Sequence, residues 1–151
     1  MKYLLFALFL TLIANAANLE ITAKDFYHKD GEKKAIFSGN VVAKEGSNII
    51  YADKIVIFLN DKNEAVKYEA TGNVKFEIKD EKKNVKGSCN RLIYIPDKDL
   101  YKLYDNVALH DLLNKRDIYG DEVILDNKNK TSMAKSNGKK PVKFLFKVKD
   151  K

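Results

Sequence analysis

Three short stretches that share one pattern decide the fold: "FSGNVVAKEG" (37–46), "ATGNVKFEIK" (70–79) and "LYDNVALHD" (103–111). In each of them Gly-Asn or Asp-Asn comes directly before a valine, and the asparagines stand at positions 40, 73 and 106. The interval is 33 residues both times. A fixed period of this length is typical of a chain built from repeated supersecondary units, so the identity of the unit decides the architecture.

The repeated unit is a β-strand, because apolar and polar residues alternate along it. In the second copy Val74, Phe76 and Ile78 fall on one side of the chain, whereas Lys75 and Glu77 fall on the other. Such alternation is typical of a strand with one buried face and one solvated face. No stretch after the N-terminal segment keeps an apolar stripe of helical period for three turns, which excludes the helical repeats of similar length.

A second phrase follows each copy of the first. It reads "YADKIVIF" (51–58), "SCNRLIYI" (88–95) and "YGDEVILD" (119–126), and an earlier, weaker copy reads "ITAKDFYH" (21–28). Each phrase places a small residue beside a polar pair and then returns to alternation. We interpret this as a strand that bends, with the small side chain at the corner and the polar pair facing water.

Turn-forming clusters of Gly, Pro, Asn and Asp separate these phrases and complete an all-β prediction. The chain is expected to form eight to ten strands, mostly antiparallel because the connections are short. We expect the Gly-Asn or Asp-Asn pairs to set a bend or bulge, since these residues tolerate a positive φ. The expected architecture is a sandwich or slightly opened roll of two sheets, formed by a single domain over residues 17–151.

Aligning the copies predicts which side chains point into this roll. They form either a plain hydrophobic core or, in part, a groove for acyl chains. The predicted inward-facing set, taken as the candidate lipid-binding residues, is Leu19, Ile21, Phe37, Val41, Ile55, Ile57, Tyr68, Val74, Phe76, Leu92, Tyr94, Leu103, Val107, Leu109, Val123 and Leu125.

The first 16 residues have the pattern of a cleaved secretory signal. A basic start at Lys2 precedes an apolar run over 3–13, and "ANA" (14–16) supplies the small residues that a signal peptidase reads. The apolar run is shorter than the roughly 20 residues of a membrane-spanning helix. We therefore expect cleavage after Ala16 and export to a bacterial periplasm; an uncleaved membrane anchor is the alternative. No cysteine directly follows the signal, which excludes attachment as a lipoprotein.

Composition and motifs give little sign of chemistry. The single cysteine, Cys89, excludes an intramolecular disulfide, and we expect it to be a small buried residue. His28 and His110 lack a metal-ligand spacing, and no catalytic or nucleotide-binding motif occurs. The net charge of +7 comes almost entirely from lysine, which codon bias explains as well as an anionic partner would. We expect no enzyme activity, cofactor, metal or nucleic-acid partner.

Taken in order, "FSGNVVAKEGSNIIYADKIVIF" (37–58), "ATGNVKF" (70–76) and "DIYGDEVILD" (117–126) resemble the LptA/OstA family of periplasmic lipopolysaccharide transport proteins. The resemblance extends from about residue 19 to about residue 133. Two positions depart from it: the third copy has Asp105 in place of glycine, and Cys-Asn-Arg (89–91) stands in place of Ala-Asp-Lys. These departures concern local geometry.

The resemblance implies a V-shaped β-jellyroll that binds the acyl chains of lipid A, with Leu19 and Ile21 among the lipid contacts. It also implies head-to-tail stacking and partners of the LptC and LptD type, in a bridge that carries lipopolysaccharide to the outer membrane. We expect the strand at 141–148 to be a joining edge. Two other hypotheses remain: an LptC-like protein anchored in the membrane by residues 1–16, and a structural β-repeat module without a lipid site.

Overall fold

A computed structural model of the chain describes residues 19–149 and therefore begins after the segment interpreted as a signal peptide. Within these residues no helix is long and apolar enough to cross a membrane. Between residues 19 and 149 the regular elements are β-strands, apart from one turn of 3-10 helix, η1 (Pro96–Lys98). The strands are β1 (Leu19–Thr22), β2 (Asp25–Tyr27), β3 (Lys34–Glu45), β4 (Asn48–Leu59), β5 (Ala65–Lys79), β6 (Asn84–Ile95), β7 (Leu100–Asp111), β8 (Arg116–Asp126), β9 (Thr131–Lys135) and β10 (Lys143–Phe146).

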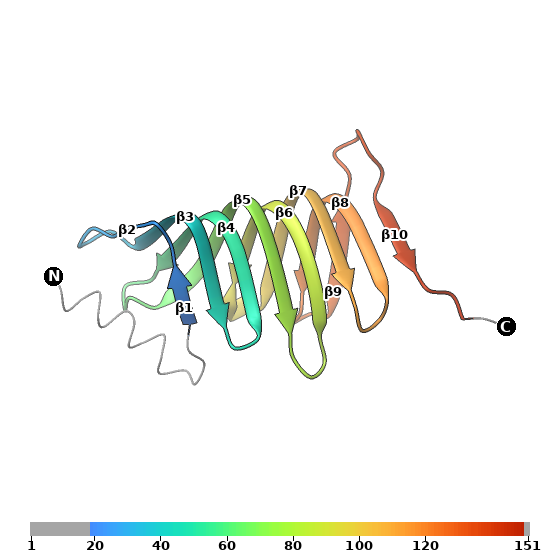
Figure 1. Cartoon of the computed structure of the whole chain (residues 1–151), viewed down its shortest axis with the longest axis horizontal. Helices are drawn as coiled ribbons and strands as arrows, with labels where there is room; N and C mark the ends of the chain where they lie inside the picture. The colour runs from blue at the N-terminus through green and yellow to red at the C-terminus, as the bar shows by residue number, and fades with distance from the viewer. Residues whose placement is uncertain (1–18, 150–151) are drawn as a thin grey trace.

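All strand pairs are antiparallel, and the strands form one sheet in the order β1-β3-β4-β5-β6-β7-β8-β10, with β2 also paired to β3 and β9 to β8. Figure 1 shows the strands side by side from β1 and β2 at the N-terminal end to β10 at the C-terminal end. The all-β antiparallel roll expected from the sequence is confirmed. Its two layers, however, are two halves of the same bent strands.

The bends coincide with the repeated pairs. Gly39-Asn40 on β3, Gly72-Asn73 on β5 and Asp105-Asn106 on β7 all have positive φ values, between 47° and 85°. Each pair lies opposite a single residue of the neighbouring strand, so each is a β-bulge. We call the line through these three pairs the fold line. The opposing residues are the polar ones of the second phrase, Asp53, Asn90 and Asp121.

Glycine is required at Gly72 for two reasons. Its φ of 80° disfavours any L side chain, and an added Cβ would lie 2.4 Å from Oδ2 of Asp53. The same carboxylate oxygen accepts a hydrogen bond of 3.0 Å from Nδ2 of Asn73, which closes the corner. The third copy instead has Asp105 at a φ of 66°, a conformation that aspartate tolerates better than most residues.

The fold line divides the sheet into two layers that face each other. The first layer contains β1, β10 and the halves of β3–β8 that pair with them; the second contains β2, β9 and the remaining halves. Large side chains of both layers, such as Phe76 from the first and Leu103 from the second, meet in one buried core. In the weak first copy the chain also turns at the fold line, but the strand is interrupted there: β1 ends at Thr22 in the first layer and β2 begins at Asp25 in the second.

A glycine substitution tests the fold line. We expect Gly72→Ala to lower the free energy of unfolding by about 2–4 kcal/mol, because it combines left-handed strain with a clash against Asp53. Gly31→Ala is the matched control, since Gly31 has a φ of 86° but open space around the position of a Cβ. Urea unfolding should give a loss of only about 1–2 kcal/mol for the control. Equal losses would show that the corner contact contributes nothing.

Candidate functional site

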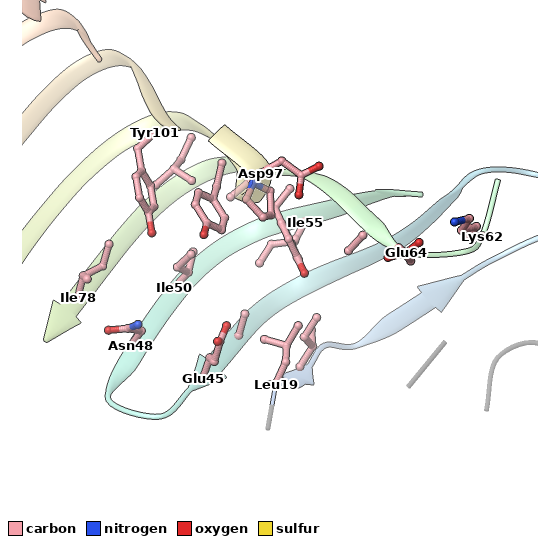
Figure 2. A pocket seen from close by; sticks show the side chains of 18 residues that line it. Leu19, Glu45, Asn48, Ile50, Ile55, Lys62, Glu64, Ile78, Asp97 and Tyr101 are labelled. Carbon is pink, nitrogen blue, oxygen red and sulfur yellow. The ribbon is translucent and has the colours of Figure 1, made fainter. Parts of the chain in front are cut away.

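The two layers do not close over their whole length. A groove of about 740 Å³ lies between them at the N-terminal end of the roll. Figure 2 shows Leu19, Ile50 and Ile78 of the first layer on one wall, with Tyr101 and Asp97 on the opposite wall. The carboxylate, amide and ammonium groups of the groove lining come from strand ends and turns, whereas the residues inside the strands are apolar or tyrosines.

Side-chain size explains why the groove lies at this end. Ala43, Ala65 and Ala70 line it, and such short side chains cannot span the distance between the layers. Further along the first layer the ring of Phe76 fills the interior beside Gly87, where an added Cβ would lie 2.3 Å from the ring. The roll is thus packed in its middle and open where alanines replace large residues.

The rim comes from the turns at the free ends of both layers. Glu45 and Asn48 flank the β3–β4 turn, Lys62 and Glu64 belong to the β4–β5 turn, and Asp97 lies in η1. The floor lies next to the fold line, where strand pairing places Ala70 between Ile55 and Leu92. The groove therefore deepens from charged turns to a purely apolar base, an arrangement suited to an amphiphile.

Three tyrosines on adjacent strands form one row of the second-layer wall. Tyr68 pairs with Tyr94, which pairs with Tyr101. Their rings are stacked, with centroids 5.9 Å and 4.4 Å apart. Burial, with a smaller contribution from Glu45, raises the pKa of Tyr68 to about 12, and burial likewise raises the pKa of Tyr94 and Tyr101. All three phenols are therefore neutral hydrogen-bond donors at physiological pH.

The structure separates the sixteen predicted lipid-binding residues into two groups. Nine are buried in the packed core and do not line the groove, and Leu125 packs against that core, whereas Ile55 and Leu92 are buried but also line the groove. The nine are Phe37, Val41, Ile57, Val74, Phe76, Leu103, Val107, Leu109 and Val123. The six that line the groove are Leu19, Ile21, Ile55, Tyr68, Leu92 and Tyr94.

The sequence analysis missed the other twelve lining residues. Two of them carry the same alternation signal as the predicted set: Ile78 and Tyr101 are each two positions from a predicted inward residue on the same strand. Ile50 lies across the fold line from Ile55, at an odd spacing, so simple alternation does not find it. The small and turn residues carry no such signal. The twelve are Ala43, Glu45, Asn48, Ile50, Lys62, Glu64, Ala65, Ala70, Ile78, Pro96, Asp97 and Tyr101.

The candidate reactive residues lie away from the groove. The imidazole of His28 hydrogen-bonds to the carbonyl oxygen of Lys34, and that of His110 pairs with Asp117 at 2.7 Å on the next strand. In the part of the chain that the structure describes, no cluster of three or more His, Cys, Asp or Glu side chains could hold a metal ion. Cys89 is 4% exposed in the core, as expected, and its thiol donates to the carbonyl of Arg91 at 3.3 Å.

Comparison with known proteins agrees with this geometry. Residues 20–131 match the model of a family described as "LptA/(LptD N-terminal domain) LPS transport protein". The chain belongs to this family. Its structure is similar to that of LptH, the LptA-homologous periplasmic component of the lipopolysaccharide transport device of Pseudomonas aeruginosa. The TM-score is 0.73 at 15% sequence identity, over 86% of this chain and 95% of that one. No curated protein sequence matches.

The burial of Cys89 has a chemical consequence. Desolvation raises the pKa of its thiol to about 11, against an ordinary value of 9.0, so the thiolate is about 100-fold scarcer at pH 8 than for a free cysteine. We expect the folded protein to react with Ellman's reagent at least about 100-fold more slowly than the protein in 6 M guanidinium. Reaction at the rate of a free thiol would mean that the fold line beside Cys89 opens readily.

Proposed function

We propose that this chain carries lipopolysaccharide through the periplasm, from the inner to the outer membrane, by sheltering the acyl chains of lipid A in the groove. The family to which the chain belongs is one of lipopolysaccharide transport. The observation that supports the finer proposal is the groove itself, with an apolar floor at Ile55, Ala70 and Leu92 and a charged rim. The groove argues against the alternative hypothesis of a structural β-repeat module, which would have a fully packed interior.

The energetics favour such a cargo. Each methylene removed from water stabilises the complex by about 0.8 kcal/mol, so acyl chains need shelter throughout an aqueous compartment. A methylene needs about as much space as one water molecule, roughly 30 Å³. The groove of about 740 Å³ thus has room for roughly 25 methylenes, or about two chains of a dozen carbons. A lipid with more chains must widen the roll or extend beyond one copy.

Transport of this kind requires no catalysis by the chain. The family description names a transport protein, and the groove brings together no nucleophile with a base. A bridge protein shields its cargo while the energy for movement comes from elsewhere in the system. We infer that the protein acts in the periplasm after cleavage behind Ala16, a site that lies outside the described residues.

The two ends of the roll suit head-to-tail assembly, as well as pairing with LptC-like and LptD-like folds. β1 and β2 form the edge at one end, and β9 and β10 form the edge at the other. The inward-facing row of the first layer continues through Ile118 to Phe144 on β10, where the ring is 46% exposed. Phe146 is 61% exposed beside it. A second copy added to this edge would cover these rings and extend the apolar interior.

A photo-reactive residue placed in the groove tests the lipid proposal. We expect a benzoyl-phenylalanine at Ile50 to crosslink to lipid A, because Ile50 lines the groove. The same residue at Ile49 is the matched control, since successive side chains of a strand point to opposite faces. Crosslinked adducts would be counted by intact mass. Equal labelling at both positions, or none at Ile50, would refute binding in the groove.

Removal of the C-terminal edge tests the assembly proposal. We expect deletion of 141–151 to shift the protein from concentration-dependent oligomers to monomers in light scattering, because β10 and its exposed phenylalanines are lost. A second variant, Lys143→Pro, removes a backbone donor without removing the apolar side chains and should weaken assembly in the same direction. Oligomers of unchanged size in both variants would place the joining surface elsewhere.

A further inference from the structure

The tyrosine row (Tyr68, Tyr94 and Tyr101) is set at one depth in the groove. Two residues further along each strand toward the fold line stand Ala70, Leu92 and Leu103, which are all buried. A two-residue step along a strand is about 7 Å, so the rings lie one side-chain layer above the apolar base. The charged turns lie further out. The row therefore marks the boundary between the apolar and the polar part of the groove.

Tyrosine suits such a boundary because its ring is apolar and its hydroxyl is polar. The hydroxyl of Tyr101 is hydrogen-bonded to that of Tyr94, and Tyr101 projects from the second layer into the groove (Figure 2). Among the groups of residues 19–149 that shift the pKa of Tyr68, none is a hydrogen-bond partner of its hydroxyl, and its side chain packs partly buried against the core. The row thus presents donors that an occupant of the groove can use.

The surrounding charge limits which acceptor the row can bind. The carboxylate of Glu45 acts electrostatically on all three phenols, and that of Asp99 acts on Tyr94 and Tyr101. No lysine or arginine is among the groups that shift these phenols. Lys62, the basic residue of the groove lining, lies in the β4–β5 turn and not at the level of the row, so a phosphate beside the phenols would meet the like charge of Glu45 and Asp99, whereas a neutral carbonyl would not. An uncharged acceptor is therefore favoured.

Acyl chains of a membrane lipid join its headgroup through such neutral acceptors. We propose that the tyrosine row binds the ester and amide carbonyls at the junction between acyl chains and headgroup, and so fixes how deeply the lipid enters. This inference rests on the proposed function, since it assigns a subsite within the same groove. The methylenes then occupy the base beside Ala70 and Leu92, and the phosphorylated sugars remain outside, beyond the tyrosine row.

Replacement of hydroxyls without loss of rings tests this subsite. The variant Tyr68→Phe/Tyr94→Phe keeps the stacked rings but removes two donors. Binding of lipid A and of diphenylhexatriene, a hydrocarbon probe without any carbonyl, would be measured by fluorescence for the wild type and the variant. We expect lipid A to bind about two- to tenfold more weakly per hydroxyl removed, while the hydrocarbon binds equally well. Tyr51→Phe, a half-exposed tyrosine absent from the groove lining, is the control and should change neither affinity.

Each other outcome is decisive. An unchanged affinity for lipid A in the double variant would overturn the assignment of the carbonyl subsite and leave the proposed function standing. An equal loss for lipid A and for the hydrocarbon would also overturn it, because the hydroxyls would then support only the shape of the groove. A wild-type protein that binds the hydrocarbon but not lipid A would refute the proposed function itself.

Discussion

The structure depends on a backbone constraint at three places along the chain. At Gly39-Asn40, Gly72-Asn73 and Asp105-Asn106 two successive residues adopt left-handed conformations, and the extra residue of each bulge turns the strand. Because these pairs lie on alternate strands of one antiparallel sheet, their bends align into a single line. The 33-residue period is therefore the combined length of two strands and the two turns that connect them. A different spacing would scatter the bends and leave a twisted sheet without an interior.

Once the sheet is folded, side-chain volume decides where the interior is solid. No polar or charged residue is buried within the described part of the chain, so the contact between the two layers in the core is apolar. In the middle, large side chains such as Phe76 and Leu103 meet. At the N-terminal end the short side chains of Ala43, Ala65 and Ala70 leave space between the layers, and this space forms the groove. The same architecture thus supplies a stabilising core and a binding site. The core forms where large side chains of the two layers meet, and the groove forms where alanines take their place.

Periodicity predicted much of this from the sequence, for reasons that particular residues make clear. The alternation around Val74 and Phe76 gave the strands and the buried face, and the Gly-Asn pairs gave the bends. What alternation cannot give is the distance between facing layers. Phe76 and Ile78 lie on the same face of β5 and are indistinguishable by alternation, yet Phe76 is buried in the core and Ile78 lines the groove. Rim residues such as Lys62 and Asp97 were missed because turns carry no periodic signal.

One more property follows from the fact that both walls belong to a single folded sheet. Two independent sheets can move apart only if the interface between them is broken. Here the distance between the two layers depends on the angle at which the strands bend at the fold line. The ladders of hydrogen bonds run between neighbouring strands, at right angles to that opening motion, and remain intact as the angle changes. A change of this angle needs rotation only about the backbone torsions at the fold line, in the bulges of β3, β5 and β7 and in the residues opposite them on β4, β6 and β8. We therefore expect the molecule to resist extension along its length while the width of the groove adjusts to the size of the bound molecule.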